Sequence, residues 1–156
     1  MLKIEKILIP TDFSEQSKVA VPYALDMANR YDAELHVIHV FDEAALDPMF
    51  FSYSEKNAQE FFNEVEEGFE AEVESFLDIP GELDVNLYPV LANGNPFVEI
   101  IRYAKEQDMD MVIIGTHGRT GLSHMLLGSV AEKVIRKAHC PVLAVRSPDF
   151  EFEPPV

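Results

Sequence analysis

Short apolar runs alternate with helix-like segments along this 156-residue chain, and this alternation constrains the fold more than any other feature. Each apolar run has the length of a buried strand, and each segment between runs carries apolar residues at helical spacing. Strands that alternate with helices form a parallel sheet, whose right-handed crossovers place helices on both faces. We expect strands at 6–12, 34–40, 84–91, 109–115 and 141–146, and helices at 15–28, 61–77, 97–104 and 129–138.

Five such strands predict a single-domain, doubly wound α/β sheet of order 3-2-1-4-5, which is a Rossmann-like arrangement. Ligands of these sheets bind beyond the carboxyl ends of the strands, where the strand order reverses. The reversal falls between the first strand, which ends at Asp12, and the fourth strand, which ends at Gly115. Two loops that are far apart in the sequence are therefore expected to form one crevice.

Several single residues predict where these elements begin, bend or pair. Ser14 has the residue type of an N-cap for the first helix, and Asn95 followed by Pro96 has the pattern of a second helix start. Pro22 removes a backbone hydrogen bond inside the first helix, so we expect a kink or a delayed start there. Pro89 favours an edge position for the third strand.

Two glycine-containing segments lie at the expected crevice. The fourth strand runs into Gly115-Thr116-His117-Gly118, and after nine residues Gly128-Ser129 opens a helix. Glycines let backbone N–H groups approach a ligand closely, and a helix N-terminus attracts anions, so the pair resembles a phosphate cradle. In the alternative interpretation the glycines only make turns and Ser129 only caps a helix. Spacing alone does not separate the two, and the segment matches neither a Walker P-loop nor a G-x-G-x-x-G fingerprint.

The charge distribution excludes nucleic acid as a partner. The net charge is −16, and residues 1–78 carry 18 acidic and 5 basic residues. A polyanion is repelled by such a molecule. The segment 119–146 is locally basic, with one acidic residue, Glu132, against five basic ones. Its local charge is therefore compatible with phosphate binding. The five basic residues are Arg119, Lys133, Arg136, Lys137 and Arg146.

The remaining composition indicates a cytoplasmic protein. No apolar run approaches the ~18 residues of a membrane span, so no membrane insertion is expected. The chain runs from its first residues straight into a strand-like segment, which predicts that it carries no signal peptide. Its single cysteine, Cys140, excludes an internal disulfide and is interpreted as a small apolar residue at a helix–strand junction.

The full string Gly115-x2-Gly118-x9-Gly128-Ser129, with Pro10-Thr11-Asp12 and the segment 140–145, closely resembles the universal stress protein (UspA-like) family. The resemblance covers residues 7–145, and in that family G-x2-G-x9-G-[ST] marks the members that bind ATP. It implies an adenine-nucleotide-hydrolase-like fold, with a universal stress protein domain over 1–147 and an acidic, flexible tail over 148–156.

The same resemblance implies how ATP is held. The triphosphate lies on the backbone at both glycine segments, and the base and ribose lie against the ends of the first, second and fourth strands. Mg²⁺ is expected to be held mainly by phosphate oxygens and water, and Asp12 is the only carboxylate considered as a metal contact. The candidate binding residues are Pro10, Thr11, Asp12, Val40, Ile114, Gly115, Gly118, Arg119, Gly128, Ser129 and Val130.

Basic and histidine side chains near the motif leave alternatives open. Arg119 suits phosphate geometry, but it is equally typical of a solvent-facing loop, whereas His117 is interpreted as such a loop residue. His36 and His39 fall on opposite faces of one expected strand, so they do not predict a metal site.

No catalytic constellation is recognisable in the sequence. ATP hydrolysis needs a group that orients water and a group that neutralises charge, and only the second has a candidate, Arg119. We therefore expect an ATP-binding regulatory or stress-response protein that is at most a slow ATPase. The alternatives are a slow ATPase or phosphotransferase and a nucleotide-free dimeric scaffold.

The last expected strand predicts self-association. It would lie at a sheet edge, and an apolar edge strand invites pairing with another chain. Members of the resembled family dimerise through this strand, so we expect a homodimer formed through Val142 to Val145. A regulatory protein partner is also expected, and the sequence does not identify it.

Overall fold

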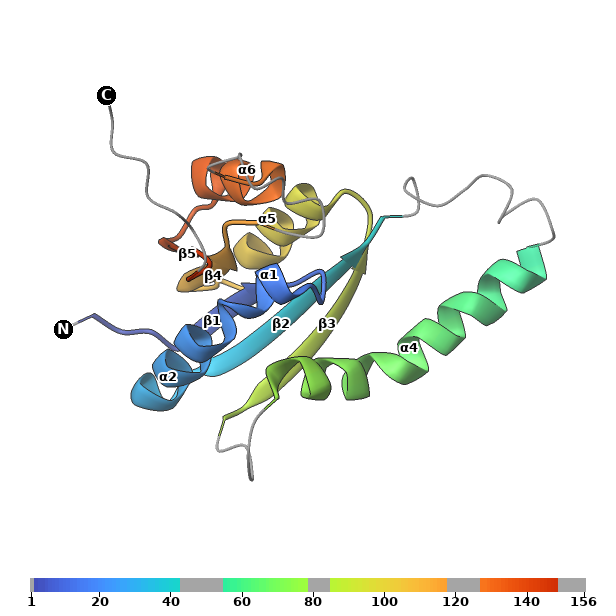
Figure 1. Ribbon diagram of the computed structural model, residues 1–156, viewed down its shortest axis with the longest axis horizontal. Coiled ribbons are helices and arrows are strands. Elements are labelled where there is room, and N and C mark those ends of the chain that lie inside the picture. Colours follow the sequence, from blue (N-terminus) through green and yellow to red (C-terminus); the bar gives the residue numbers. More distant parts are fainter. Residues whose placement is uncertain (1, 43–54, 79–84, 118–126, 149–156) are drawn as a thin grey trace.

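A computed structural model describes residues 2–42, 55–78, 85–117 and 127–148 of the chain. Within these ranges, five parallel strands form one twisted sheet in the order β3-β2-β1-β4-β5 (Figure 1), which confirms the predicted order. β3 is at the edge, as Pro89 indicated. The strands are β1 (Lys6–Pro10), β2 (Glu34–Phe41), β3 (Leu87–Asn93), β4 (Met111–Gly115) and β5 (Val142–Val145).

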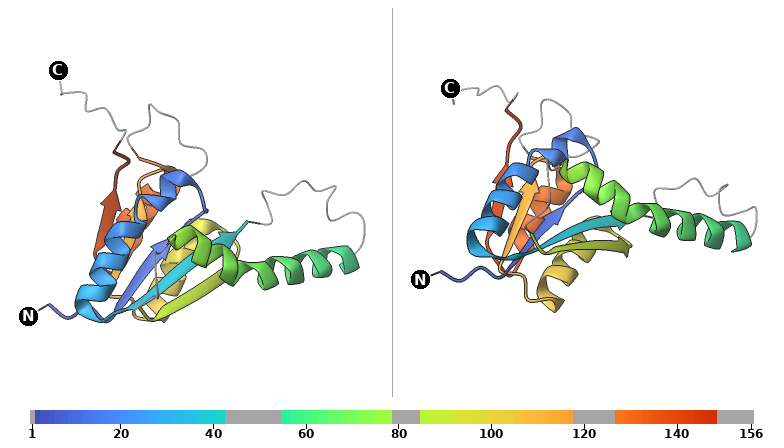
Figure 2. Two further views of the ribbon diagram at one scale, coloured as in Figure 1. Left: turned by 60° about the horizontal axis from the view of Figure 1, so that its bottom comes forward. Right: turned by 90° about the horizontal axis from the view of Figure 1, so that it is seen from below.

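Helices cover both faces of the sheet, as Figure 2 shows from two further directions. On one face lie α1 (Glu15–Lys18), α2 (Val21–Tyr31) and α4 (Glu55–Leu77), and on the other lie α5 (Pro96–Glu106) and α6 (Ser129–Lys137). The carboxyl-terminal part of α4 packs on the sheet, whereas its amino-terminal part projects past the sheet (Figure 1). No helix in the described ranges has the length and apolar character needed to cross a bilayer.

Alternation along the strands divides the apolar residues into two cores. In β1, Ile7 and Ile9 pack with α2 and α4, whereas Leu8 packs with α5 and α6. All three side chains are fully buried. A strand that is buried on both faces reads as a continuous apolar run, which is why β1 was recognisable from its sequence.

Several element boundaries differ from the expected ones, and three of the differences have a visible cause or consequence. Pro22 lies in the first turn of α2, so the first helix is divided into α1, which Ser14 caps, and α2. β4 begins at Met111 rather than at 109, because the Met109 N–H donates to the Ala104 carbonyl and closes α5 (2.8 Å). β3 spans Leu87–Asn93 rather than 84–91 and pairs with β2 as far as Phe41.

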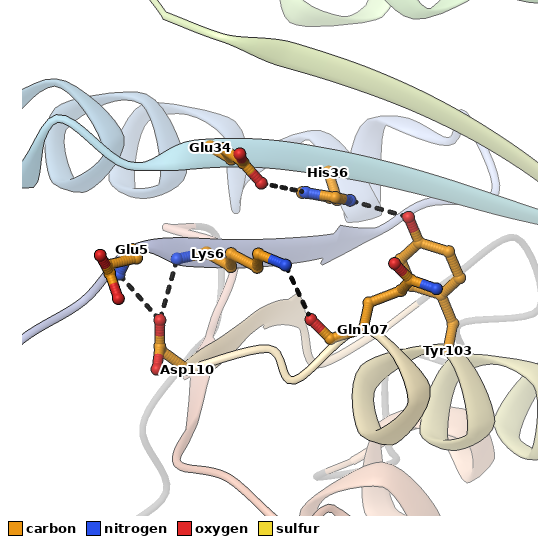
Figure 3. Close-up of polar contacts among 7 residues, drawn as sticks. All are labelled: Glu5, Lys6, Glu34, His36, Tyr103, Gln107 and Asp110. Atoms are coloured by element: carbon orange, nitrogen blue, oxygen red, sulfur yellow. Dashed lines mark hydrogen bonds and ion pairs between the residues drawn. The ribbon is translucent and has the colours of Figure 1, made fainter.

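A carboxylate fastens the amino ends of β1 and β4. The Asp110 Oδ2 atom accepts the backbone N–H groups of Glu5 (2.8 Å) and Lys6 (3.0 Å). The Lys6 ammonium also donates to the Gln107 carbonyl (3.1 Å), as Figure 3 shows. One side chain thus satisfies two backbone donors where the two strands begin.

Removal of this carboxylate should destabilise the fold. We expect Asp110→Ala to lower the free energy of unfolding by about 2 kcal/mol, because two N–H groups lose a charged acceptor. Urea unfolding followed by circular dichroism measures the change. Glu106→Ala, which removes an exposed carboxylate at the end of α5, is the matched control. Equal stability of the two variants would show that the Asp110 contacts contribute nothing.

Candidate functional site

The carboxyl ends of β1 and β4 separate and leave space between them. The two strands pair at Ile7 with Met111 and at Leu8 with Val112. Further along, the Thr11 N–H donates to β2 at the Ile38 carbonyl (2.9 Å), and the Thr116 N–H donates to β5 at the Val145 carbonyl (2.9 Å). Each strand end therefore stays with its outer neighbour.

A cavity of about 210 Å³ lies at this point, where the strand order reverses. It is formed by the end of β1, the end of β2, the first turn of α5, the end of β4 and the start of α6. Its lining residues are Pro10, Thr11, Asp12, Ser17, Ile38, Val40, Pro96, Ile100, Ile114, Gly115, Thr116, His117, Gly128, Ser129, Val130 and Ala131.

Most of the candidate residues from the sequence lie in this lining. That they contact a nucleotide stays a prediction, although their convergence on one cavity is a property of the fold. Gly118 and Arg119 lie outside the described residues. The candidates that line the cavity are Pro10, Thr11, Asp12, Val40, Ile114, Gly115, Gly128, Ser129 and Val130.

The turn after β1 is held by a network of short hydrogen bonds. The Thr11 hydroxyl lies 3.0 Å from the Ser17 hydroxyl and accepts the Phe13 N–H (2.8 Å). An Asp12 carboxylate oxygen accepts the Ser14 N–H (3.0 Å). Thr11 and Ser17 are both buried, so this network fixes the position of the cavity wall that they form.

Phe13 occupies a backbone conformation that costs free energy. Its φ is 61°, in the left-handed region that side-chain-bearing residues rarely adopt. Its ring packs at 6.1 Å from the Phe69 ring, 5.6 Å from the Phe76 ring and 4.8 Å from the His39 ring, measured between centroids. These aromatic contacts compensate for the strain and hold the turn that carries Asp12.

Gly115 allows α1 to lie directly against the end of β4. A Cβ atom at this position would be 2.7 Å from the Gln16 carbonyl oxygen and 3.2 Å from the Ser17 Cα atom. Both are backbone atoms, so a side chain at position 115 would displace α1 from the sheet. This close approach brings the hydroxyl of Ser17 into the same wall as Thr11.

Gly128 is the residue just before α6, and it connects this helix to the turn after β4. Its N–H donates to the Thr116 carbonyl (2.6 Å), and its own carbonyl accepts the Glu132 N–H (2.9 Å). Gly128 is therefore the N-cap, and Ser129 is the first helical residue, so the interpretation of Ser129 as the cap is wrong. Because glycine has no side chain, the N-cap residue itself makes no side-chain hydrogen bond to the N–H groups of this first turn.

The sequence analysis missed several lining residues. Ile38 lies two residues before Val40 on the same face of β2, so strand periodicity could have identified it. His117 was interpreted as solvent-facing, but it is half-buried in the lining, with Nδ1 at 3.0 Å from the Thr116 hydroxyl. The missed residues are Ser17, Ile38, Pro96, Ile100, Thr116, His117 and Ala131.

Charged side chains are sparse in the cavity itself. Asp12 is the only carboxylate among the lining residues that the structure describes. Lys133 lies one turn beyond Ser129, with its ammonium 4.7 Å from the centroid of the Phe97 ring, next to Pro96. Within the described ranges no three His, Cys, Asp or Glu side chains form a group that could hold a metal ion. The Cys140 thiol packs beside the α5–α6 core, and its pKa is raised by burial.

The chain resembles known proteins over nearly its whole length. It matches the model of the universal stress protein family over residues 3–146. Universal stress protein MJ0531 of Methanocaldococcus jannaschii is 38% identical over 149 residues, which cover 94% of this chain and 85% of that protein. Universal stress protein MJ0577 of the same organism is 33% identical over 153 residues, which cover 91% of this chain and 94% of that protein.

Solved structures share the fold. The structure of MJ0577 covers 95% of this chain and 99% of its own, with a TM-score of 0.77 and 29% sequence identity. The universal stress protein from Archaeoglobus fulgidus in complex with dAMP covers 93% of this chain and 99% of its own, with a TM-score of 0.60 and 20% identity. At that identity the likeness is one of fold alone.

The close approach at Gly115 predicts a position-specific effect of one methyl group. We expect Gly115→Ala to lower the free energy of unfolding by about 2 kcal/mol, because its Cβ overlaps backbone atoms of α1. Gly68→Ala, in the exposed part of α4 where a Cβ meets nothing within 4 Å, should instead stabilise by about 1 kcal/mol. Thermal unfolding measures the stability change of both variants. Changes of the same sign would contradict the prediction.

Proposed function

The chain belongs to the universal stress protein family, and on this premise we propose that it binds ATP in the cavity between β1 and β4 as a nucleotide-dependent regulatory or stress-response protein. The observation that carries the proposal is the convergence of Asp12, Gly115 and the Gly128-Ser129 helix start on one cavity. These segments are more than a hundred residues apart at their extremes, and only the fold brings them together.

The two ends of the cavity suit the two ends of a nucleotide. The start of α6 supplies first-turn N–H groups that its N-cap, a glycine, does not cap with a side chain, together with the exposed Ser129 and the positive end of the helix dipole, all of which favour phosphate. Ile38, Val40 and Ile100 supply an apolar wall for a base. Gly118, from the same motif, is proposed to complete the phosphate-binding segment.

A divalent cation fits this arrangement. Asp12 is an acidic residue in a cavity that is proposed to hold a triphosphate, and two like charges repel each other. A Mg²⁺ ion coordinated by phosphate oxygens, water and at most one carboxylate removes that repulsion. We therefore propose that ATP binds as its Mg²⁺ complex, with Asp12 as the protein group nearest to the metal.

The proposal is for holding ATP rather than for rapid turnover. Phosphoryl transfer needs a positioned water and a cation at the developing charge. Arg119 is the sequence candidate for the cation, and His117 is the lining histidine beside the α6 start. The Archaeoglobus fulgidus relative holds dAMP, which supports an adenine nucleotide as the ligand class for this fold.

We propose that the protein is a cytoplasmic homodimer with an unidentified regulatory partner. The single cysteine fits a reducing compartment. β5 is the outer strand beside β4, and Leu143 and Val145 of this strand belong to the α2–α4 core. The Pro141 and Val145 carbonyls accept bonds from β4, so the backbone groups of Val142 and Ala144 point toward the outer edge. That edge is the proposed contact between two copies.

ATP binding should depend on the Ser129 hydroxyl. We expect wild-type protein to bind MgATP in calorimetric titration, and Ser129→Ala to weaken binding by about tenfold, since one charge-assisted hydrogen bond is lost. Binding of adenosine should change little, because adenosine carries no phosphate. Ser75→Ala, an exposed serine on α4, is the matched control. A wild-type protein that binds no ATP, and releases none on denaturation, would overturn the proposal.

Proline at the sheet edge should separate the two copies. Ala144→Pro removes an N–H that points away from β4, so the sheet keeps its own bonds while edge pairing is lost. We expect light scattering to give the mass of one 17.6 kDa protomer for this variant, and twice that mass for wild type and Ala144→Ser. A variant that stays dimeric would place the contact elsewhere on the molecule.

A further inference from the structure

Beside the cavity, a buried histidine joins two of its walls. We propose that the contact between His36 of β2 and Tyr103 of α5 positions these walls for the nucleotide and makes ATP affinity fall when His36 is protonated. This inference rests on the proposed function, because the affinity that it regulates is that of the same cavity. It assigns His36 and Tyr103 as positioning residues, since neither lines the cavity.

The geometry around His36 is closely packed. Its side chain is 6% exposed, with Nδ1 at 2.7 Å from the Tyr103 hydroxyl and Nε2 at 3.2 Å from a Glu34 carboxylate oxygen, as Figure 3 shows. The ring of Tyr88 stacks on the imidazole at 4.7 Å between centroids, with 14° between the planes. His36 is therefore held by groups from β2, β3 and α5 together.

Each partner lies on an element that contributes to the cavity. His36 precedes Ile38 by two residues on the same face of β2, and Ile38 lines the cavity. Tyr103 follows Ile100 by one helical turn on α5, and Ile100 also lines the cavity. The hydrogen bond therefore fixes the spacing between two walls that are otherwise joined by apolar packing.

The neutral imidazole satisfies both partners without burying a positive charge. The Glu34 carboxylate can only accept, so Nε2 donates to it, and Nδ1 is left to accept the Tyr103 hydroxyl proton. When His36 is protonated, Nδ1 becomes a donor and can no longer accept that proton. The bond then reverses, with Nδ1–H donating to the Tyr103 oxygen, and the tyrosine proton needs another acceptor. The imidazolium charge lies in a side chain that is only 6% exposed, so protonation favours arrangements in which β2 and α5 move apart.

The surroundings of His36 set the sign of the pH effect. Burial is the largest influence and lowers the pKa of His36 below its ordinary value, while Glu34 on β2 raises it and Lys6 on β1 lowers it slightly. Tyr103 on α5 has its own pKa raised by burial, so it stays protonated, and Tyr88 is the facing group from β3. The contact is thus uncharged at neutral pH, and it is progressively destabilised as the pH falls below the ordinary pKa of histidine and His36 takes up a proton.

The test compares ATP affinity from about pH 7.5 to about pH 5 in wild type and two variants. His36→Asn keeps an acceptor for the Tyr103 hydroxyl but does not titrate, so we expect near-wild-type affinity at neutral pH and an acid loss about fivefold smaller. Tyr103→Phe removes only the hydroxyl, so we expect about fivefold weaker binding at neutral pH and the same reduced acid loss. Wild-type pH slopes in both variants would overturn the inference.

Controls separate His36 from other titrating groups. The cavity region also contains His117 in the lining and His39 at the Thr11 carbonyl (2.9 Å), and ATP itself takes up protons, so the effect of His36 is read from the difference between each variant and wild type. His139→Asn, which changes an exposed histidine between α6 and β5, should keep the wild-type slope. A slope reduced as much in this variant as in His36→Asn would contradict the assignment to His36.

Hydrogen exchange distinguishes the failure of this inference from the failure of the proposed function. If wild type binds no ATP at any pH, the proposed function fails, but the His36–Tyr103 contact is still testable. Amide protection of α5, corrected for intrinsic exchange, should fall on acidification in wild type and stay level in His36→Asn. Equal loss of protection in both proteins would overturn the inference whether or not ATP binds.

Discussion

The separation of β1 and β4 beyond Leu8 is the feature on which the site depends. Below that point the two strands pair, and above it each one bonds only to its outer neighbour. In a doubly wound parallel sheet, the connection after one central strand runs to one face of the sheet and the connection after the other runs to the opposite face. The chain therefore separates where these two strands end. The cavity is therefore a direct product of the topology, and the glycines at 115 and 128 allow the backbone segments around it to pack closely against each other.

The fold was predictable from the sequence because its signals are local. Buried parallel strands are continuous apolar runs, and Pro22 and Pro96 mark helix starts by removing a backbone donor. The cap of α6 was not predictable, because glycine and serine are both acceptable caps and only the position of the Thr116 carbonyl decides between them. The binding segment at Gly118 and Arg119 lies beyond the described residues, so its role stays a prediction.

Some of the lining residues were missed because they are brought to the cavity by tertiary contacts rather than by the periodicity of one element. Ser17 reaches the cavity because α1 lies against the end of β4, a contact between segments about a hundred residues apart in the chain. Spacing rules describe one element at a time, so they do not report such meetings. His36 and Tyr103 are similar: their separation of 67 residues hides a 2.7 Å hydrogen bond.

The Asp110 carboxylate has a consequence for how a ligand enters. It joins β1 and β4 at their amino ends, which is the end of the sheet remote from the cavity. The central strands are thus fixed at one end and already apart at the other. Entry and exit of the proposed nucleotide would leave the β1–β4 pairs, Ile7 with Met111 and Leu8 with Val112, intact. Ligand exchange would therefore not require the paired part of the central strands to open.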